Sequence, residues 1–144
     1  MSYKKWFMNH AKKHNEIMKK LLDYSDEEVI EYFRYENMQK SEPDFCPLYA
    51  KNKKCHDLAE LNCYFCGCNN FRFNDDGFEQ INYKTLKSYC GIDSKDGSVF
   101  EGKDALHQNC SACTVPHHEF YIKKNFKRDW LAIMANVDNN TGSD

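Results

Sequence analysis

The first residues of the chain carry apolar and aromatic side chains at helical spacing. Such spacing places side chains on one face of a helix, so an amphipathic helix is predicted over residues 1–22. The side chains of that face recur at three- and four-residue steps: Trp6, His10, His14, Ile17 and Leu21.

Ser25 marks the start of a second predicted helix. Glu28 follows three residues later and completes a capping box, in which each side chain accepts a hydrogen bond from the backbone N–H of the other residue. The apolar stripe that begins at Val29 extends this helix to about residue 39. Because the connection before Ser25 is short, we expect the two helices to fold as an antiparallel hairpin over residues 1–40.

The helical period is lost over residues 45–116, which contain all eight cysteines and five of the six glycines. This composition is typical of a cysteine-rich metal module with irregular loops. Phe71-Arg72-Phe73 predicts a short strand, which leads into a turn over 74–77 and a second strand. Residues 93–102 predict a polar loop.

Helical spacing returns after Pro116. Phe120, Phe126 and Trp130 can lie on one face, which predicts a C-terminal helix over 117–136 that packs on the metal module. A flexible tail is expected over 137–144. The pattern therefore predicts a single α+β domain, in which a small metal-stabilised irregular module with short strands is flanked by the helical hairpin and the C-terminal helix.

The chain is poor in aliphatic residues for its length. Isoleucine, leucine, valine and phenylalanine make up 28 of its 144 residues, a share at which chains begin to resemble disordered ones. However, the net charge is only −2 and 15% of the residues are aromatic, which is not typical of disorder. We expect a folded protein with an aromatic core, and bound metal to supply the stability that the core lacks, because zinc contributes about 10–16 kcal/mol per site in small modules.

Charge is unevenly distributed. Residues 1–22 contain six lysines and one acidic residue, whereas residues 23–44 contain eight acidic residues and two basic ones. The near-neutral total disfavours nucleic acid as the main partner. No signal-peptide or membrane-span pattern occurs, so we expect a cytoplasmic protein without membrane contact. A protein partner is expected to contact either the helical hairpin or a basic cluster formed by Lys123, Lys124, Lys127 and Arg128.

The eight cysteines are the candidate chemistry. A reducing cytosol disfavours disulfides. Two CxxC pairs occur, and this spacing lets two thiolates face one tetrahedral ion. Zinc suits a site that fixes loops, because it has no redox chemistry. We predict about two zinc ions, with the cysteines as ligands and two histidines in reserve: Cys46, Cys55, Cys63, Cys66, Cys68, Cys90, Cys110 and Cys113, with His56 and His117.

The sequence does not determine which cysteines share an ion. An iron–sulfur cluster takes the same thiolate ligands and stays an alternative, as does a cluster in which thiolates bridge two ions. A redox CxxC pair or a nucleophilic cysteine is disfavoured, because no helix start follows Cys66 and the even number leaves no thiol over. We expect Cys63 and Cys66 of the CxxCxC motif to share one ion with Cys110 and Cys113. Cys68 follows the flexible Gly67, so we expect it to turn away and to share the other ion with Cys46, Cys55 and Cys90.

The remaining histidines have other expected roles. His10 and His14 are four residues apart on the first helix, but no third ligand is evident nearby, so we expect them to be solvated or packed. His107 is expected in a loop and His118 at the surface. His117 follows Pro116 at a helix start, where it is either a ligand or a hydrogen-bond donor to a thiolate.

The ordered cysteine motifs resemble the cysteine-rich small domain family, a zinc-finger-like group, over about residues 45–122. This resemblance implies a bound metal at the cysteines and says little about activity. The chain departs from the family where Gly67 and Asn69-Asn70-Phe71 stand in place of an aromatic residue and a Pro-Leu-Tyr-like continuation. The resemblance is carried by five motifs: Cys46-Pro47, Cys55-His56, Asn62-Cys63-Tyr64-Phe65-Cys66-Gly67-Cys68, Cys90-Gly91 and Cys110-Ser111-Ala112-Cys113-Thr114-Val115-Pro116-His117.

Taken together, these features favour a non-enzymatic binding or adaptor protein with two mainly cysteine-ligated structural zinc sites. The alternative is an iron–sulfur protein or another metalloprotein that handles electrons or a cofactor.

Overall fold

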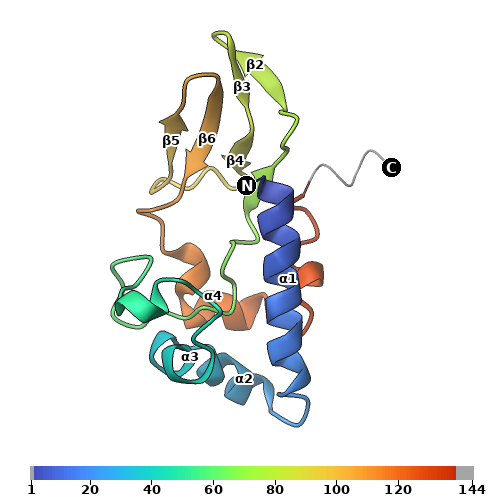
Figure 1. The fold of residues 1–144 in the computed structure, drawn as a ribbon, viewed down its shortest axis with the longest axis vertical. Helices are drawn as coiled ribbons and strands as arrows, with labels where there is room; N and C mark the ends of the chain where they lie inside the picture. Colours follow the sequence, from blue (N-terminus) through green and yellow to red (C-terminus); the bar gives the residue numbers. More distant parts are fainter. Residues whose placement is uncertain (1, 139–144) are drawn as a thin grey trace.

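The computed structural model describes residues 2–138 and has the predicted α+β architecture (Figure 1). The helices gather in one half of the molecule and the strands in the other. None of the described helices is long and apolar enough to cross a membrane. In chain order the helical elements are α1 (Tyr3–Lys19), α2 (Asp26–Tyr32), α3 (Tyr35–Ser41), η1 (Tyr49–Lys51), η2 (Val115–His117), α4 (Glu119–Lys124) and α5 (Trp130–Ile133).

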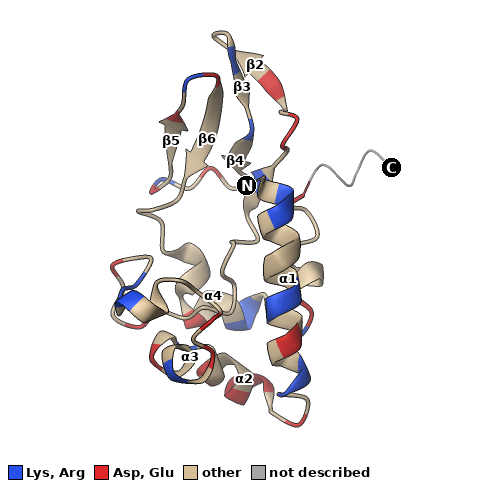
Figure 2. Ribbon diagram, in the orientation of Figure 1, with Lys and Arg blue, Asp and Glu red and all other residues tan. Residues whose placement is uncertain are grey.

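Helix α1 is amphipathic, as predicted. Its N-terminus is capped by Ser2, whose hydroxyl accepts a hydrogen bond from the backbone N–H of Lys5. One face is buried, and the lysines lie on the other face (Figure 2). The buried side chains follow the helical period: Phe7, His10, Ala11, His14, Ile17 and Met18.

Helix α2 begins at the predicted capping box. The Ser25 hydroxyl accepts from the Glu28 N–H at 3.1 Å, and the Glu28 carboxylate accepts from the Ser25 N–H at 2.9 Å. The prediction of one helix to residue 39 is wrong, however, because the chain breaks between α2 and α3. There the carbonyl of Phe33 accepts from the Cys63 N–H at 2.8 Å, and the Tyr35 N–H donates to the carbonyl of Leu61 at 3.0 Å. Pairing with a distant segment replaces the helical hydrogen bonds.

The basic and the acidic segments of the N-terminal region meet at one ion pair. In Figure 1, α2 and α3 lie beside the lower end of α1 and do not run along its length. Lys20, directly after α1, pairs with Glu42, directly after α3, at 2.5 Å. Among the ion pairs of residues 2–138, none joins α1 to α2, so the charged residues of these two helices (Figure 2) do not pair with each other.

Six short strands form two sheets. Strand β1 (Phe71–Phe73) pairs antiparallel with β4 (Ser88–Cys90). The second sheet has the order β2 (Glu79–Ile81), β3 (Lys84–Leu86), β6 (Ala105–Asn109) and β5 (Ser98–Glu101), with β3 and β6 parallel and the other pairs antiparallel.

The strand at β5 corrects two expectations. Residues 93–102 are not entirely a loop, because Ser98–Glu101 pairs with β6. His107 lies in β6 opposite Phe100, and its ring nitrogen Nδ1 shares a hydrogen bond with the hydroxyl of Tyr3. This pairing is non-local, so the polar composition of the segment gives no sign of it.

The C-terminal helix predicted over 117–136 is two short helices, α4 and α5. The segment between them is held by other parts of the chain: the Tyr64 hydroxyl donates to the carbonyl of Lys127 at 2.6 Å, and Arg128 donates to the carbonyl of Tyr24 at 2.6 Å. Asp129 then caps α5. The tail predicted from residue 137 begins later, since Val137 is buried with α5 and residue 138 is buried beside β1. Residues 139–144 of that tail lie outside the described part.

The core is rich in aromatic side chains, as its composition predicts. One cluster joins α1, α2 and α3 to Leu61 and the Cys63–Phe65 segment. A smaller cluster joins Phe7 and Ala11 to β1 and α5. The cysteine-rich segment is therefore part of the main core and does not form a separate layer.

Candidate metal centre

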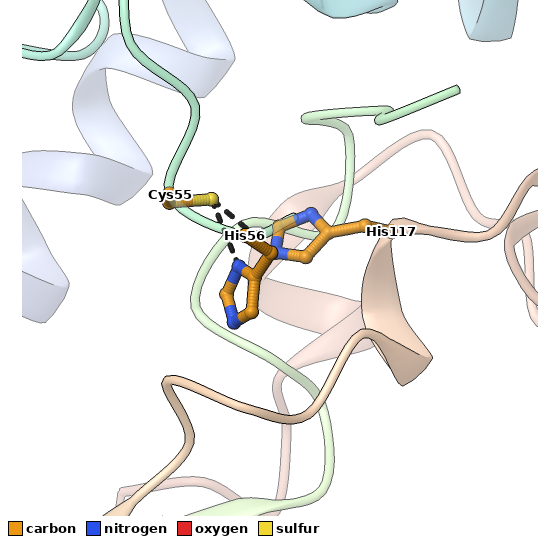
Figure 3. A group of neighbouring side chains, drawn as sticks. All are labelled: Cys55, His56 and His117. Atoms are coloured by element: carbon orange, nitrogen blue, oxygen red, sulfur yellow. Dashed lines mark hydrogen bonds between the residues drawn. The ribbon is translucent and has the colours of Figure 1, made fainter. Parts of the chain in front are cut away.

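Cys55, His56 and His117 form a cluster of three metal-ligating side chains (Figure 3). Their candidate donor atoms lie within 4.8 Å of one another. The Sγ atom of Cys55 is 3.0 Å from Nδ1 of His56 and 3.7 Å from Nε2 of His117. Zinc–sulfur bonds of about 2.3 Å and zinc–nitrogen bonds of about 2.0–2.1 Å at tetrahedral angles require a sulfur–nitrogen separation of about 3.5 Å. The observed distances lie on either side of that value.

Backbone carbonyls fix which nitrogen of each ring faces the cluster. Nε2 of His56 lies 2.8 Å from the carbonyl of Cys110, and Nδ1 of His117 lies 2.9 Å from the carbonyl of Asn62. A carbonyl only accepts, so these nitrogens carry the protons. In a neutral ring the opposite nitrogen then has its lone pair directed at Cys55. Metal-bound histidines commonly have this arrangement.

Asn62 positions His117 in two ways. Its carbonyl accepts from His117, and its own N–H donates to the carbonyl of His117 at 3.1 Å. The Asn62 side chain is fully buried and donates to the carbonyl of Ile30 at 2.7 Å and to Glu119 at 3.1 Å. No role was predicted for Asn62 from the sequence. Its position directly before a CxxC pair is the one sequence feature that points to it.

Burial favours the neutral form of His117, which can bind a metal ion. It also favours the protonated thiol of Cys55, which must lose its proton before it binds one. Burial lowers the pKa of His117 to about 4, so its imidazole is neutral near pH 7. Burial, and next the charge of Cys46, raises the pKa of the Cys55 thiol. A metal ion would therefore release a proton from Cys55 when it binds.

With both imidazole rings neutral, the cluster has more lone pairs than protons. The thiol proton of Cys55 can satisfy only one of the two nitrogens that face its sulfur. The other nitrogen then faces a sulfur atom with no proton between them, which is an unfavourable contact in a partly buried site. A cation that all three atoms can share removes this conflict.

Three further cysteines lie close to this cluster. Cys46, Cys63 and Cys66 are near enough for charge on one to affect the others: burial, and then the charge of Cys63, raises the pKa of Cys66 well above its usual value. Burial likewise raises the pKa of Cys63 to about 12. Among the residues that the structure describes, none of the three joins the cluster as a fourth donor within 4.8 Å.

The other four cysteines form a second set. Burial, followed by the charges of Cys113 and Cys90, raises the pKa of Cys68 to about 11. Burial, and then the charges of Cys68, Cys113 and Cys90, raises the pKa of Cys110 to about 11. Ser94 links Cys90 and Cys113. Its N–H donates to the sulfur of Cys90 at 3.4 Å, and its hydroxyl lies 3.3 Å from the sulfur of Cys113. No role was predicted for Ser94 from the sequence.

These neighbours differ from the arrangement expected from the sequence. Cys63 and Cys66 lie near Cys46 and Cys55 and not near Cys110 and Cys113, whereas Cys68 keeps its expected neighbour Cys90. The division at Gly67 follows from its backbone, which has φ +106°, a conformation that glycine adopts readily. The two sets are Cys46, Cys55, Cys63 and Cys66 on one side, and Cys68, Cys90, Cys110 and Cys113 on the other.

A pocket of about 400 Å³ lies between the two sets. Six of the eight cysteines line it, together with His56 and His117. Most of the remaining wall is aromatic or aliphatic and comes from α1, β1 and η2, including Tyr3, Trp6, Phe71 and Val115.

The remaining histidines lie elsewhere. His10 and His14 were expected to be either solvated or packed, and both are packed. The ring of His10 stacks on Trp6 at 4.8 Å between centroids. His118 is partly buried, and its Nε2 shares a hydrogen bond with the hydroxyl of Thr114 at 2.9 Å. Within residues 2–138, neither His10 nor His14 joins a group of three metal-ligating side chains.

Comparison with known proteins adds no relative. No protein-family model matches the chain, and no curated protein or solved structure is significantly similar to it. The eight cysteines and the Cys55, His56 and His117 cluster are compatible with a cysteine-rich domain.

Proposed function

We propose that this protein binds two zinc ions that hold its cysteine-rich module together, and that it acts as a non-enzymatic binding protein. The convergence of Cys55, His56 and His117 carries the proposal. These three residues are the ligands of the first ion, and their mixed nitrogen and sulfur donors suit zinc. The second ion takes the second set of thiols: Cys68, Cys90, Cys110 and Cys113.

The chemistry of the core supports a structural role for the ions. The strands are short, and β2 and β5 are exposed along their whole length. Strands of three to five residues bury too little apolar surface to fix the loops between them. Zinc sites in small modules contribute about 10–16 kcal/mol each, which compares with the whole stability of an ordinary domain.

Elemental analysis of the purified protein and two variants tests this proposal. We expect about two zinc ions per chain in the natural protein, and about one each in H117Q and C68S, because each substitution removes a ligand from a different site. H118Q is the matched control: this neighbouring histidine pairs with Thr114 and is expected to be dispensable for metal. A natural protein without metal, or variants that both keep two ions, would overturn the proposal.

An iron–sulfur cluster is the second candidate, favoured by the four thiols of the second set, since such clusters take four cysteine ligands. Purification without oxygen distinguishes the two. Iron and inorganic sulfide in equal amounts, with a brown colour, identify a cluster. A colourless sample that contains zinc excludes it.

The proposed partner is another protein, and the charged surfaces are the candidates for contact. The acidic residues at the start of α2 are exposed, as are Lys123, Lys124 and Lys127. Arg128 belongs instead to the fold, because it pairs with Asp26 at 2.9 Å. Reversal of the three lysine charges is expected to abolish co-purification of a partner while metal content stays unchanged; retention of the same partner by that variant argues against this surface.

A further inference from the structure

We propose that the ion at Cys55, His56 and His117 keeps one coordination position open towards the pocket and there binds a small apolar thiol. This inference rests on the proposed metal site and adds a ligand-binding role to it. Structural zinc sites have four protein ligands, whereas zinc sites that bind an external ligand have three. The first site therefore differs in kind from the four-cysteine site.

The first site brings together three donor atoms. Cys55 Sγ lies 3.0 Å from His56 Nδ1 and 3.7 Å from His117 Nε2, and all three atoms lie within 4.8 Å of one another. Across residues 2–138, no fourth cysteine, histidine or carboxylate places its donor atom within 4.8 Å of all three. Cys66 belongs to the same set of thiols as Cys55 and lines the same pocket, but it stands outside this group of donor atoms. Its backbone carbonyl accepts from the Trp130 indole N–H at 3.2 Å.

The open position of the first site faces the pocket. Cys55, His56 and His117 all line the 400 Å³ pocket. A fourth ligand on their ion can therefore extend into a space large enough for a small molecule. Most of the pocket wall beyond the sulfur atoms is apolar, including Tyr3, Trp6, Phe7, Phe71, Phe73 and Val115, and three polar side chains also line it: Asn70, Ser94 and Gln108.

The net charge of the first site favours an anionic fourth ligand. A divalent ion with one thiolate and two neutral imidazoles leaves a net charge of about +1 beside an apolar wall, which is costly. An anionic donor neutralises it. A thiolate supplies that charge with a soft sulfur atom suited to zinc, and an apolar body fits the aromatic wall. Binding forms one metal–sulfur bond and releases the thiol proton to solvent.

Cobalt substitution with thiophenol as the probe tests the open position. The variant C68S is used because it is expected to retain only the first site, and H117Q because it is expected to retain only the second. In cobalt-loaded C68S, thiophenol is expected to raise the sulfur-to-cobalt absorbance in the near ultraviolet until one thiol is bound per chain, with cobalt retained after gel filtration. Cobalt-loaded H117Q is expected to show no change.

The outcomes separate this inference from the proposed function. If C68S binds no cobalt, the metal site is wrong and both fall. If it binds cobalt but thiophenol changes nothing, or removes the cobalt, only the open position is wrong. A response that appears only when Cys66 is also replaced by serine shows that Cys66 fills the fourth position, and likewise overturns the inference.

The apolar pocket has its own test. Ile92 lines the pocket and is 55% exposed, so it marks the open side. I92W, made in the C68S background, is expected to weaken thiophenol binding by about tenfold, which corresponds to about 1.4 kcal/mol. The polar thiol 2-mercaptoethanol is expected to bind at least about tenfold more weakly than thiophenol, by the same measure. Equal affinity for both thiols contradicts recognition by the apolar wall.

Discussion

At the scale of single residues, His10 shows how an aromatic core accommodates imidazole rings. It lies between Trp6, Phe45 and Trp130, with ring centroids 4.8 to 4.9 Å away, and is 5% exposed. Its Nε2 atom is buried without a hydrogen-bond partner. Burial lowers the pKa of His10 to about 3, because the charged ring would lose its hydration.

This residue makes stability depend on pH. The unfolded chain takes up a proton on His10 below about pH 6.5, whereas the folded protein does so only near pH 3. The contribution is therefore complete above pH 6.5 and falls as the pH decreases towards 3. H10F keeps an aromatic ring without this proton, so its free energy of unfolding relative to the natural protein is expected to rise by about 2 kcal/mol between pH 7 and pH 5.

Urea unfolding at several pH values measures the effect of H10F. Metal release also depends on pH, but it is common to both proteins and cancels in the difference. Parallel stability profiles for H10F and the natural protein would mean that His10 accepts its proton in the folded state.

At the scale of elements, local sequence signals predicted where a helix begins, whereas pairing with distant segments decided where it ends. The capping box of Ser25 and Glu28 is visible within four residues, and α2 begins there. The end of α2 depends on hydrogen bonds from Phe33 and Tyr35 to a segment almost thirty residues later, which periodicity cannot reveal. The break before α5 was partly readable, because Asp129 precedes Trp130 and is a good N-cap.

The turn at Gly67 is the element that separates the two cysteine sets. Its φ of +106° is strained for any residue with a side chain, and a Cβ atom there would lie 3.0 Å from the Trp130 ring and 3.3 Å from the Trp6 ring. G67A is therefore expected to lower the free energy of unfolding by about 1–3 kcal/mol.

Gly102 provides the matched control for this turn. A Cβ atom there would approach the carbonyl of Ala105 no closer than 3.4 Å, an ordinary contact. G102A is expected to change stability by no more than about 0.5 kcal/mol in the same urea titration. Similar losses in both variants would show that the turn at Gly67 carries no special strain.

At the scale of the whole molecule, the pattern along the chain predicted the class of the fold, and the shortage of aliphatic residues predicted an aromatic core. The eight cysteines indicated metal sites, which stay a prediction, and their spacing did not reveal which of them lie together. The donor set of Cys55, His56 and His117 draws on residues more than 60 positions apart, and it depends on Asn62, which holds His117 from both sides. Spacing within a motif does not determine such a contact, so it could not reveal that Cys63 and Cys66 lie near Cys46 and Cys55.

Removal of metal tests how far the cysteine-rich module supports the rest of the molecule. Cys63, Tyr64 and Phe65 are buried in the same cluster as α1, α2 and α3. If the loops around the ions become disordered, this shared core loses its central segment and the helices lose their packing. Sites worth about 10–16 kcal/mol are comparable with the whole stability of an ordinary domain, so chelation at pH 7 is expected to unfold the whole chain cooperatively.

Circular dichroism at 222 nm, followed during titration with a chelator, measures this coupling. The helical signal is expected to be lost in one transition, together with the near-ultraviolet signal of the buried aromatic rings, and to return when zinc is added but not magnesium, because thiolate and imidazole ligands do not suit magnesium. The single-site variants give the intermediate case: H117Q and C68S are each expected to unfold at lower urea concentration than H118Q. A helical signal that survives complete metal removal would mean that the helices fold independently and that the ions organise only the loops and strands.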